Sequence, residues 1–183
     1  MPSVQPLLLD FVAHFARTTP AKTAVHDLSS GRRLTYAQLD DAVDRAASVL
    51  SSLMGNPRGA RLAVVSRNSA EMLTLHFACV RSGAIFVPLN WRLAAAEISF
   101  MIGDCEPALI AMEPGFAELV ENQTIPRLLL DDSANGLAAR MRAAPPPQSP
   151  GAGVPVDGDA PITLLYSSGT TGRSKGVIVT QMN

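Results

Sequence analysis

The side chains best suited to chemistry lie close together near the end of the sequence, over residues 164–177. This segment combines glycines with serine and threonine hydroxyls and with Lys175, one of only two lysines in the chain. Glycine lets backbone N–H groups approach an anion closely, hydroxyls donate hydrogen bonds to phosphate oxygens, and lysine supplies a positive charge. The segment therefore predicts a loop that binds a polyphosphate. An ordinary hairpin turn is the alternative, and Lys175 with its flanking residues argues against it.

The spacing around Lys175 excludes a Walker A loop. That motif has glycine directly before its lysine and serine or threonine directly after it, whereas Ser174 and Gly176 occupy these positions here. The flanking segments 161–166 and 177–180 both have the composition of strands, and the second is a poor start for a helix. The predicted local structure is a strand, a glycine-rich loop and a second strand.

Upstream of the loop, predicted helices and strands alternate, which favours a layered α/β fold with a mostly parallel sheet flanked by helices. Thr35 and Gln38 form a capping-box pattern at the start of one helix, and Gly83 follows the end of another. The strands are expected at residues 23–26, 61–66, 84–87, 108–112, 127–130, 161–166 and 177–180. The helices are expected over residues 7–18, 36–54, 68 or 69 to 80, 95–102 and 135–142.

A segment rich in proline and glycine, residues 143–158, is predicted to be an exposed connector. It would divide the chain into two parts. Residues 1–142 would form an N-terminal α/β part, and residues 159–183 would form the strand, the phosphate loop and the second strand.

The segment Tyr-Ser-Ser-Gly-Thr-Thr-Gly-Arg-Ser-Lys-Gly-Val, residues 166–177, resembles the phosphate-binding signature of the adenylate-forming enzymes. Segment 83–93 is similar to one typical of their acyl-CoA synthetase branch, which includes the fatty-acid–CoA ligases. Members of this family are much longer, so the resemblance implies an N-terminal fragment whose remaining domain parts lie downstream. Two positions depart from the family pattern, because Ser174 replaces a proline and Gln181 replaces a histidine.

The resemblance implies an ATP-dependent acid–thiol ligase, which activates a small-molecule carboxylic acid as acyl-AMP and transfers it to coenzyme A. ATP, Mg²⁺ and coenzyme A are the implied cofactors of the full-length parent, and the fragment alone is expected to be inactive. Lys175 is the implied catalytic residue, and no metal ligand is assigned. The residues implied in nucleotide binding are Ser167, Ser168, Gly169, Thr170, Thr171, Gly172 and Lys175.

Composition limits the other functions that the chain could have. A formal net charge of −1 gives no sign of binding to nucleic acid or to an anionic membrane. No apolar run approaches the roughly 20 residues that a transmembrane helix needs. Two cysteines are too few for a disulfide framework or a zinc site. We therefore expect a cytoplasmic protein with reduced thiols, and the sequence does not indicate its oligomeric state.

Other polar and aromatic residues are expected to have structural roles. The three histidines lie among apolar residues, and Cys79 lies on the apolar side of a predicted helix. Asp131 and Asp132 fit a turn or a helix start better than a metal site. Trp91 and Arg92 either line an opening or brace the edge of the sheet.

Two other classes of function stay open from the sequence. One is a stand-alone nucleotide- or partner-binding module without catalysis, which a coding sequence that ends at Asn183 would favour. The other is a kinase-like or NTPase phosphate-binding protein, against which the spacing around Lys175 argues. Release of pyrophosphate rather than orthophosphate would separate the ligase from the NTPase.

Overall fold

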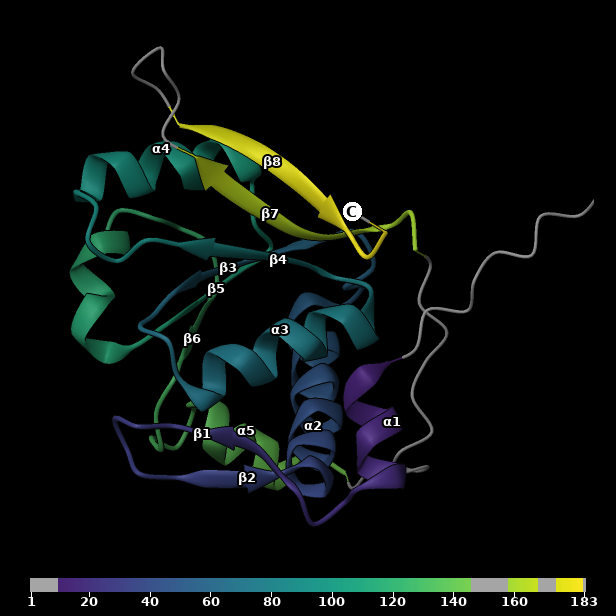
Figure 1. Ribbon diagram of the computed structural model, residues 1–183. Coiled ribbons are helices and arrows are strands. Elements are labelled where there is room, and N and C mark those ends of the chain that lie inside the picture. Colours follow the sequence, from purple (N-terminus) through teal and green to yellow (C-terminus); the bar gives the residue numbers. More distant parts are fainter. Residues whose placement is uncertain (1–9, 146–157, 168–173, 183) are drawn as a thin grey trace, which may run out of the picture.

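The computed structural model describes residues 10–145, 158–167 and 174–182. Its main feature is a six-stranded sheet with the strand order β6-β5-β3-β4-β7-β8 (Figure 1). Neighbouring strands are parallel except for β7 and β8, which form an antiparallel hairpin. The bounds of the strands are β3 (Arg61–Val65), β4 (Ile85–Leu89), β5 (Leu109–Met112), β6 (Arg127–Leu129), β7 (Pro161–Ser167) and β8 (Lys175–Thr180).

Helices cover both faces of this sheet, which confirms the predicted α/β fold. The helices α2 (Tyr36–Met54), α3 (Ala70–Ser82) and α5 (Leu137–Ala143) pack on one face. The helix α4 (Ala95–Cys105) and the 3₁₀ helix η1 (Pro114–Val120) pack on the other. A first helix, α1 (Phe11–Thr18), lies beside α2 (Figure 1). No helix in the described ranges is both long enough and apolar enough to span a membrane.

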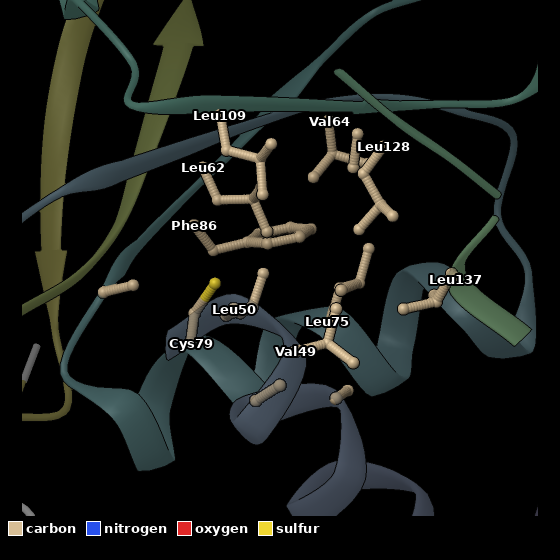
Figure 2. Close-up of a cluster of buried hydrophobic side chains, with 14 residues drawn as sticks. Val49, Leu50, Leu62, Val64, Leu75, Cys79, Phe86, Leu109, Leu128 and Leu137 are labelled. Atoms are coloured by element: carbon tan, nitrogen blue, oxygen red, sulfur yellow. The ribbon is translucent and has the colours of Figure 1, made fainter. Parts of the chain in front are cut away.

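The core is divided between the two faces because side chains alternate along each strand. On β3, Leu62 and Val64 point toward α2, α3 and α5, whereas Ala63 and Val65 point toward α4 and η1. All four side chains are fully buried, as expected for a strand of a parallel sheet covered on both faces. Figure 2 shows the first of these clusters, in which Phe86 of β4 lies among leucines from the strands and helices.

Local signals in the sequence set the ends of the helices. At the start of α2, the Thr35 hydroxyl accepts a hydrogen bond from the Gln38 backbone N–H, and the Gln38 side chain accepts one from the Thr35 N–H. The predicted capping box is therefore present. Ser69 caps the start of α3, and Gly83 ends it with φ of 75°, a left-handed conformation that favours glycine.

The structure adds two elements that we did not predict and shifts some ends. A short strand, β2 (Arg33–Thr35), pairs antiparallel with β1 (Thr23–His26) in a separate two-stranded sheet. The helix η1 also went unpredicted. The first helix begins at Phe11, because the Asp10 carboxylate accepts a hydrogen bond from the Ala13 N–H and caps it there. Residues 7–9, which we assigned to this helix, lie outside the described residues.

The two strands predicted around the glycine-rich loop both join the main sheet. Strand β7 pairs with β4 through Thr163, which lies opposite Phe86. Most of the predicted connector, residues 146–157, lies outside the described residues. The division of the chain at residues 142 and 158 therefore stays a prediction.

Candidate functional site

The described part of the predicted phosphate-binding segment is the β7–β8 hairpin. Ser167 is the last residue of β7 and lies opposite Lys175, the first residue of β8. The Ser167 hydroxyl donates a hydrogen bond to the Lys175 carbonyl oxygen, at 3.4 Å. Residues directly opposite each other in an antiparallel pair have Cβ atoms about 5 Å apart on the same face of the sheet. The side chains of Ser167 and Lys175 therefore start from neighbouring positions on one face, where the strands meet the loop.

The two faces of this hairpin are different. Ser167 and Lys175 share a face with Leu165 and Val177, and all four side chains are exposed. The alternate residues Leu164 and Tyr166 are partly buried and pack on the cluster that includes α4. The polar ends of the hairpin thus point away from α4, toward a face that the described part of the chain leaves open.

Two of the predicted site residues, Ser167 and Lys175, lie within the described residues. They end β7 and begin β8, so the second strand starts two residues earlier than the predicted residue 177. The other assigned residues lie outside the described residues: Ser168, Gly169, Thr170, Thr171 and Gly172. Their role in binding phosphate stays a prediction.

Tyr166 connects this hairpin to α4, and we did not predict this contact. Its hydroxyl donates a hydrogen bond to Asp104 Oδ2 at 2.6 Å and lies 3.3 Å from the Met101 carbonyl oxygen. Burial and the hydrogen bond to Asp104 raise the pKa of Tyr166 well above its usual range, so the phenol keeps its proton and donates it in the hydrogen bond. A sequence cannot reveal this pair directly, because the two residues are 62 positions apart.

A second group of polar and aromatic side chains lies at the carboxyl ends of β3, β4 and β5. Trp91 stacks on Phe116 with ring centroids 5.1 Å apart, and Arg67 lies over both rings. The Arg92 guanidinium is 4.2 Å from the Trp91 ring centroid. The Glu113 carboxylate accepts a hydrogen bond from the Arg67 backbone N–H at 2.7 Å. Trp91 therefore packs where adjacent strands end, and the two roles predicted for Trp91 and Arg92 stay predictions.

Most of the other titratable residues fit structural roles. His76 contacts the Phe86 ring edge-on, and burial lowers its pKa, so it is neutral near pH 7. Cys79 and Cys105 are buried free thiols, and burial raises the pKa of Cys105 to about 11. The Asp131 carboxylate accepts hydrogen bonds from the Ser133 N–H and hydroxyl, in the predicted turn. In the described ranges, no three His, Cys, Asp or Glu residues are grouped as metal ligands would be.

Comparison with known proteins identifies a family that matches almost the whole chain. The family model described as "AMP-binding enzyme" matches residues 12–183. The indoleacetate–CoA ligase of Aromatoleum aromaticum is 34% identical over an alignment of 187 positions, gaps included. The alignment covers 95% of this chain and 35% of the ligase. The chain thus spans about a third of the length of the curated relatives that it matches.

Solved structures are similar over almost the whole chain. The N-terminal domain of FACL13 from Mycobacterium tuberculosis, solved with an inhibitor, is 31% identical with a TM-score of 0.80 and covers 94% of this chain. This chain covers 44% of that one. ATP-bound MatB from Rhodopseudomonas palustris is 29% identical with a TM-score of 0.72, and the match covers 93% of this chain and 35% of MatB.

Proposed function

This chain belongs to the AMP-binding enzyme family, and on that premise we propose that it is the N-terminal part of an ATP-dependent acid–thiol ligase. The ligase activates a small carboxylic acid as an acyl-adenylate and transfers the acyl group to coenzyme A. The indoleacetate–CoA ligase supports this reaction class, because its name gives both an acid and coenzyme A. This similarity favours a ligase over a stand-alone binding module.

The observation that carries the proposal is the placement of Ser167 and Lys175. They are the described ends of the glycine-rich loop, and they lie opposite each other on an exposed face. A hydroxyl and an ammonium group on opposite strands of the loop are chemically suited to the oxygens of a polyphosphate, which accept hydrogen bonds and are negatively charged. These groups support ATP as the ligand, and MatB supports it too because it was solved with ATP bound.

The chemistry consists of two displacements. A carboxylate oxygen of the acid attacks the α-phosphorus of ATP, the bond to the β-phosphate oxygen breaks, and pyrophosphate leaves. The thiol of coenzyme A then gives its proton to solvent, its sulfur attacks the acyl carbon, the bond to the AMP oxygen breaks, AMP leaves, and a thioester forms. Lys175 stabilises the charge that develops on pyrophosphate, and Ser167 holds a phosphate oxygen. Ser168, Gly169, Thr170, Thr171 and Gly172 complete the phosphate contacts.

The remaining parts of the proposal concern cofactors, length and location. Mg²⁺ takes oxygen ligands and would be bound by phosphate oxygens of ATP, where it offsets their charge. Because the chain spans about a third of its relatives, residues 1–183 alone are expected not to catalyse adenylation. A cytoplasmic location fits the two buried free thiols.

The test is Lys175→Ala in the complete ligase that contains residues 1–183. Loss of one charge-assisted contact should slow acid-dependent release of pyrophosphate by about 10- to 150-fold in a single turnover. Lys175→Arg should restore only part of the rate, because a planar guanidinium replaces a compact charge. The second half-reaction, started from supplied acyl-adenylate, should change much less, since pyrophosphate has already left.

Two outcomes would contradict the proposal. Equal losses in both half-reactions would show that Lys175 supports the fold or the thiol step. Exchange of labelled pyrophosphate into ATP by the 183-residue chain alone would show that the chain is not dependent on further parts of a ligase. Lys22→Ala is the matched control, because it removes the chain's other lysine, which is also exposed and lies outside the hairpin.

A further inference from the structure

We infer that Tyr166 and Asp104 are positioning residues, which fix the end of the β7–β8 hairpin against α4 so that Ser167 and Lys175 face the phosphates. This inference rests on the proposed function for its catalytic part. Its structural part, a hydrogen-bonded connection between the hairpin and α4, stands on geometry alone. We call Tyr166, Ser167, Lys175 and Gly176 the loop end of the hairpin.

The loop end has few other supports in the described part of the chain. Strand β7 pairs with the parallel strand β4 at Thr163, three residues before Tyr166. Leu165 and Val177, on the open face, are 44% and 50% exposed. Beyond Thr163 the two strands pair with each other, as Tyr166 does with Gly176 and Ser167 with Lys175. A contact to a helix is therefore needed to fix the direction in which this end points.

The Tyr166 side chain supplies that contact at the right position. Its hydroxyl bonds to Asp104 at 2.6 Å, a short distance typical of a hydroxyl that donates to a carboxylate. Asp104 lies in the last turn of α4, and Met101 of the same helix presents its carbonyl oxygen 3.3 Å from the hydroxyl. The ring also packs in the cluster that contains Ile98 and Ile102 of α4. The helix is itself buried against the sheet, so it is a rigid partner.

Tyr166 acts on both strands of the loop end. It precedes Ser167 in the chain and lies opposite Gly176, which precedes Val177 and follows Lys175. A Cβ added at Gly176 would lie 2.9 Å from Leu164 Cδ1 and 3.7 Å from the Tyr166 ring, so glycine leaves room for both side chains on this face. Because neighbouring residues of a strand point to opposite faces, holding Tyr166 against α4 directs Ser167 and Lys175 to the open face.

A small displacement here would matter for adenylation. Groups that stabilise a transition state act within a few tenths of an ångström of their ideal positions, and a misplacement of about 1 Å can cost roughly 100-fold in rate. Neither Tyr166 nor Asp104 needs to touch the nucleotide. Their effect would pass through Ser167 and Lys175.

The first arm of the test measures amide hydrogen exchange in the 183-residue chain. Tyr166→Phe keeps the ring and removes the hydroxyl, so exchange at the loop end should rise about 10-fold, while exchange in β3 stays unchanged. Tyr36→Phe is the matched control, because it removes the chain's other tyrosine hydroxyl, on α2. Unchanged exchange at the loop end in Tyr166→Phe would overturn the connection.

The second arm measures single turnovers in the complete ligase. Tyr166→Phe and Asp104→Ala should each slow pyrophosphate release about 10-fold, with little change in the KM for ATP. The double variant should be no slower than Tyr166→Phe alone, because Tyr166→Phe already removes the hydrogen bond to Asp104. Asp104→Asn keeps an acceptor oxygen and should stay closer to wild type. Thioester formation from supplied acyl-adenylate should change little.

The outcomes separate this inference from the proposed function. Faster exchange with an unchanged rate of pyrophosphate release would overturn the positioning role. Equal losses in both half-reactions would also overturn it and indicate a general structural role. A wild-type ligase that releases no acid-dependent pyrophosphate would reject the proposed function, and with it the catalytic role of the pair. The hydrogen-exchange measurement would still show whether Tyr166 holds the loop end of the hairpin against α4.

Discussion

Strands β3 and β7 belong to the same sheet, yet they are built differently. Four of the five residues of β3 are fully buried, and parallel strands flank it on both sides. In β7 one residue of seven, Thr163, is buried, and one of its neighbours is the antiparallel strand β8. The first arrangement provides stability through burial on both faces. The second leaves polar groups accessible at one end.

This difference separates stability from chemistry. The central strands with α2, α3 and α4, which we call the scaffold, contain the two main apolar clusters. The hairpin contains the described residues that we propose bind phosphate, and it contacts the scaffold through β4, the α4 cluster and Tyr166. Substitutions in the scaffold should therefore change the free energy of unfolding, whereas matched substitutions in the hairpin should change function with little effect on unfolding.

The largest difference in the free energy of unfolding is expected between substitutions of two cations, Arg81 in the scaffold and Lys175 in the hairpin. The Arg81 side chain is 5% exposed, and it forms ion pairs with Asp10 at 2.7 Å, with Asp44 at 2.6 Å and with Asp40. Arg81→Ala would leave three carboxylates together without a cation, at a cost of about 3–5 kcal/mol in the free energy of unfolding. Lys175→Ala should change it by less than about 0.5 kcal/mol, because Lys175 is exposed.

Urea unfolding of the two variants, followed by circular dichroism, measures this difference. Arg81→Lys keeps the charge but loses the multiple hydrogen bonds of the guanidinium, so its loss should be intermediate. This variant keeps the comparison measurable if Arg81→Ala fails to fold. Similar losses for Arg81→Ala and Lys175→Ala would show that the hairpin contributes as much ionic stabilisation as the scaffold.

The next largest difference in the free energy of unfolding is expected between substitutions of two leucines on strands of one sheet. Leu62 of β3 is fully buried, whereas Leu165 of β7 is 44% exposed. Leu62→Ala removes buried methyl groups and leaves a cavity, so it should cost about 2–5 kcal/mol. Leu165→Ala should cost about 1 kcal/mol or less, because much of its surface is already in water. Equal costs in urea unfolding would mean that the open face of the hairpin is packed in solution.

The scaffold could largely be predicted from the sequence, because its signals are local. The helix at residues 36–54 has a capping box at its start and Gly55 at its end, and its apolar residues recur at helical spacing. Strand β2 was missed, because it has three residues, Arg33–Thr35, without an apolar run. The helix η1 was missed as well, since a 3₁₀ helix has no apolar period of 3.6 residues.

The sequence indicates a candidate site only where its chemistry is contiguous in the chain. Glycines, hydroxyls and Lys175 within one short segment indicate a phosphate loop, and this assignment stays a prediction, although Ser167 and Lys175 do lie opposite each other. The contact of Tyr166 with Asp104, and the stack of Arg67, Trp91 and Phe116, depend on which helices and strands become neighbours. Sequence spacing holds no information on those distances.

The smallest effect on the free energy of unfolding concerns a carboxylate that fixes the turn after β1 and contacts the start of α3 in the scaffold. Asp27 is 8% exposed, and its Oδ1 accepts hydrogen bonds from the Ser29 hydroxyl, the Ser29 N–H and the Ser30 N–H at 2.7–3.2 Å. Its Oδ2 accepts one from the Ala70 N–H at the start of α3. These bonds, first that from the Ser29 hydroxyl, hold the pKa of Asp27 well below its ordinary value of 3.8.

A lowered pKa in the folded state means that the unfolded chain binds more protons, so the contribution of Asp27 to stability is present above about pH 4 and is lost as the pH falls further. Asp27→Asn removes the charge, and at pH 7 it should cost about 1–3 kcal/mol in the free energy of unfolding. The difference between wild type and variant should shrink progressively between pH 4 and pH 2.5, in urea titrations at fixed ionic strength. A difference that stays constant down to pH 2.5 would show that the charge of Asp27 does not stabilise the turn. In the Lys175→Ala background the same pH dependence is expected, because the hairpin contributes nothing to this contact.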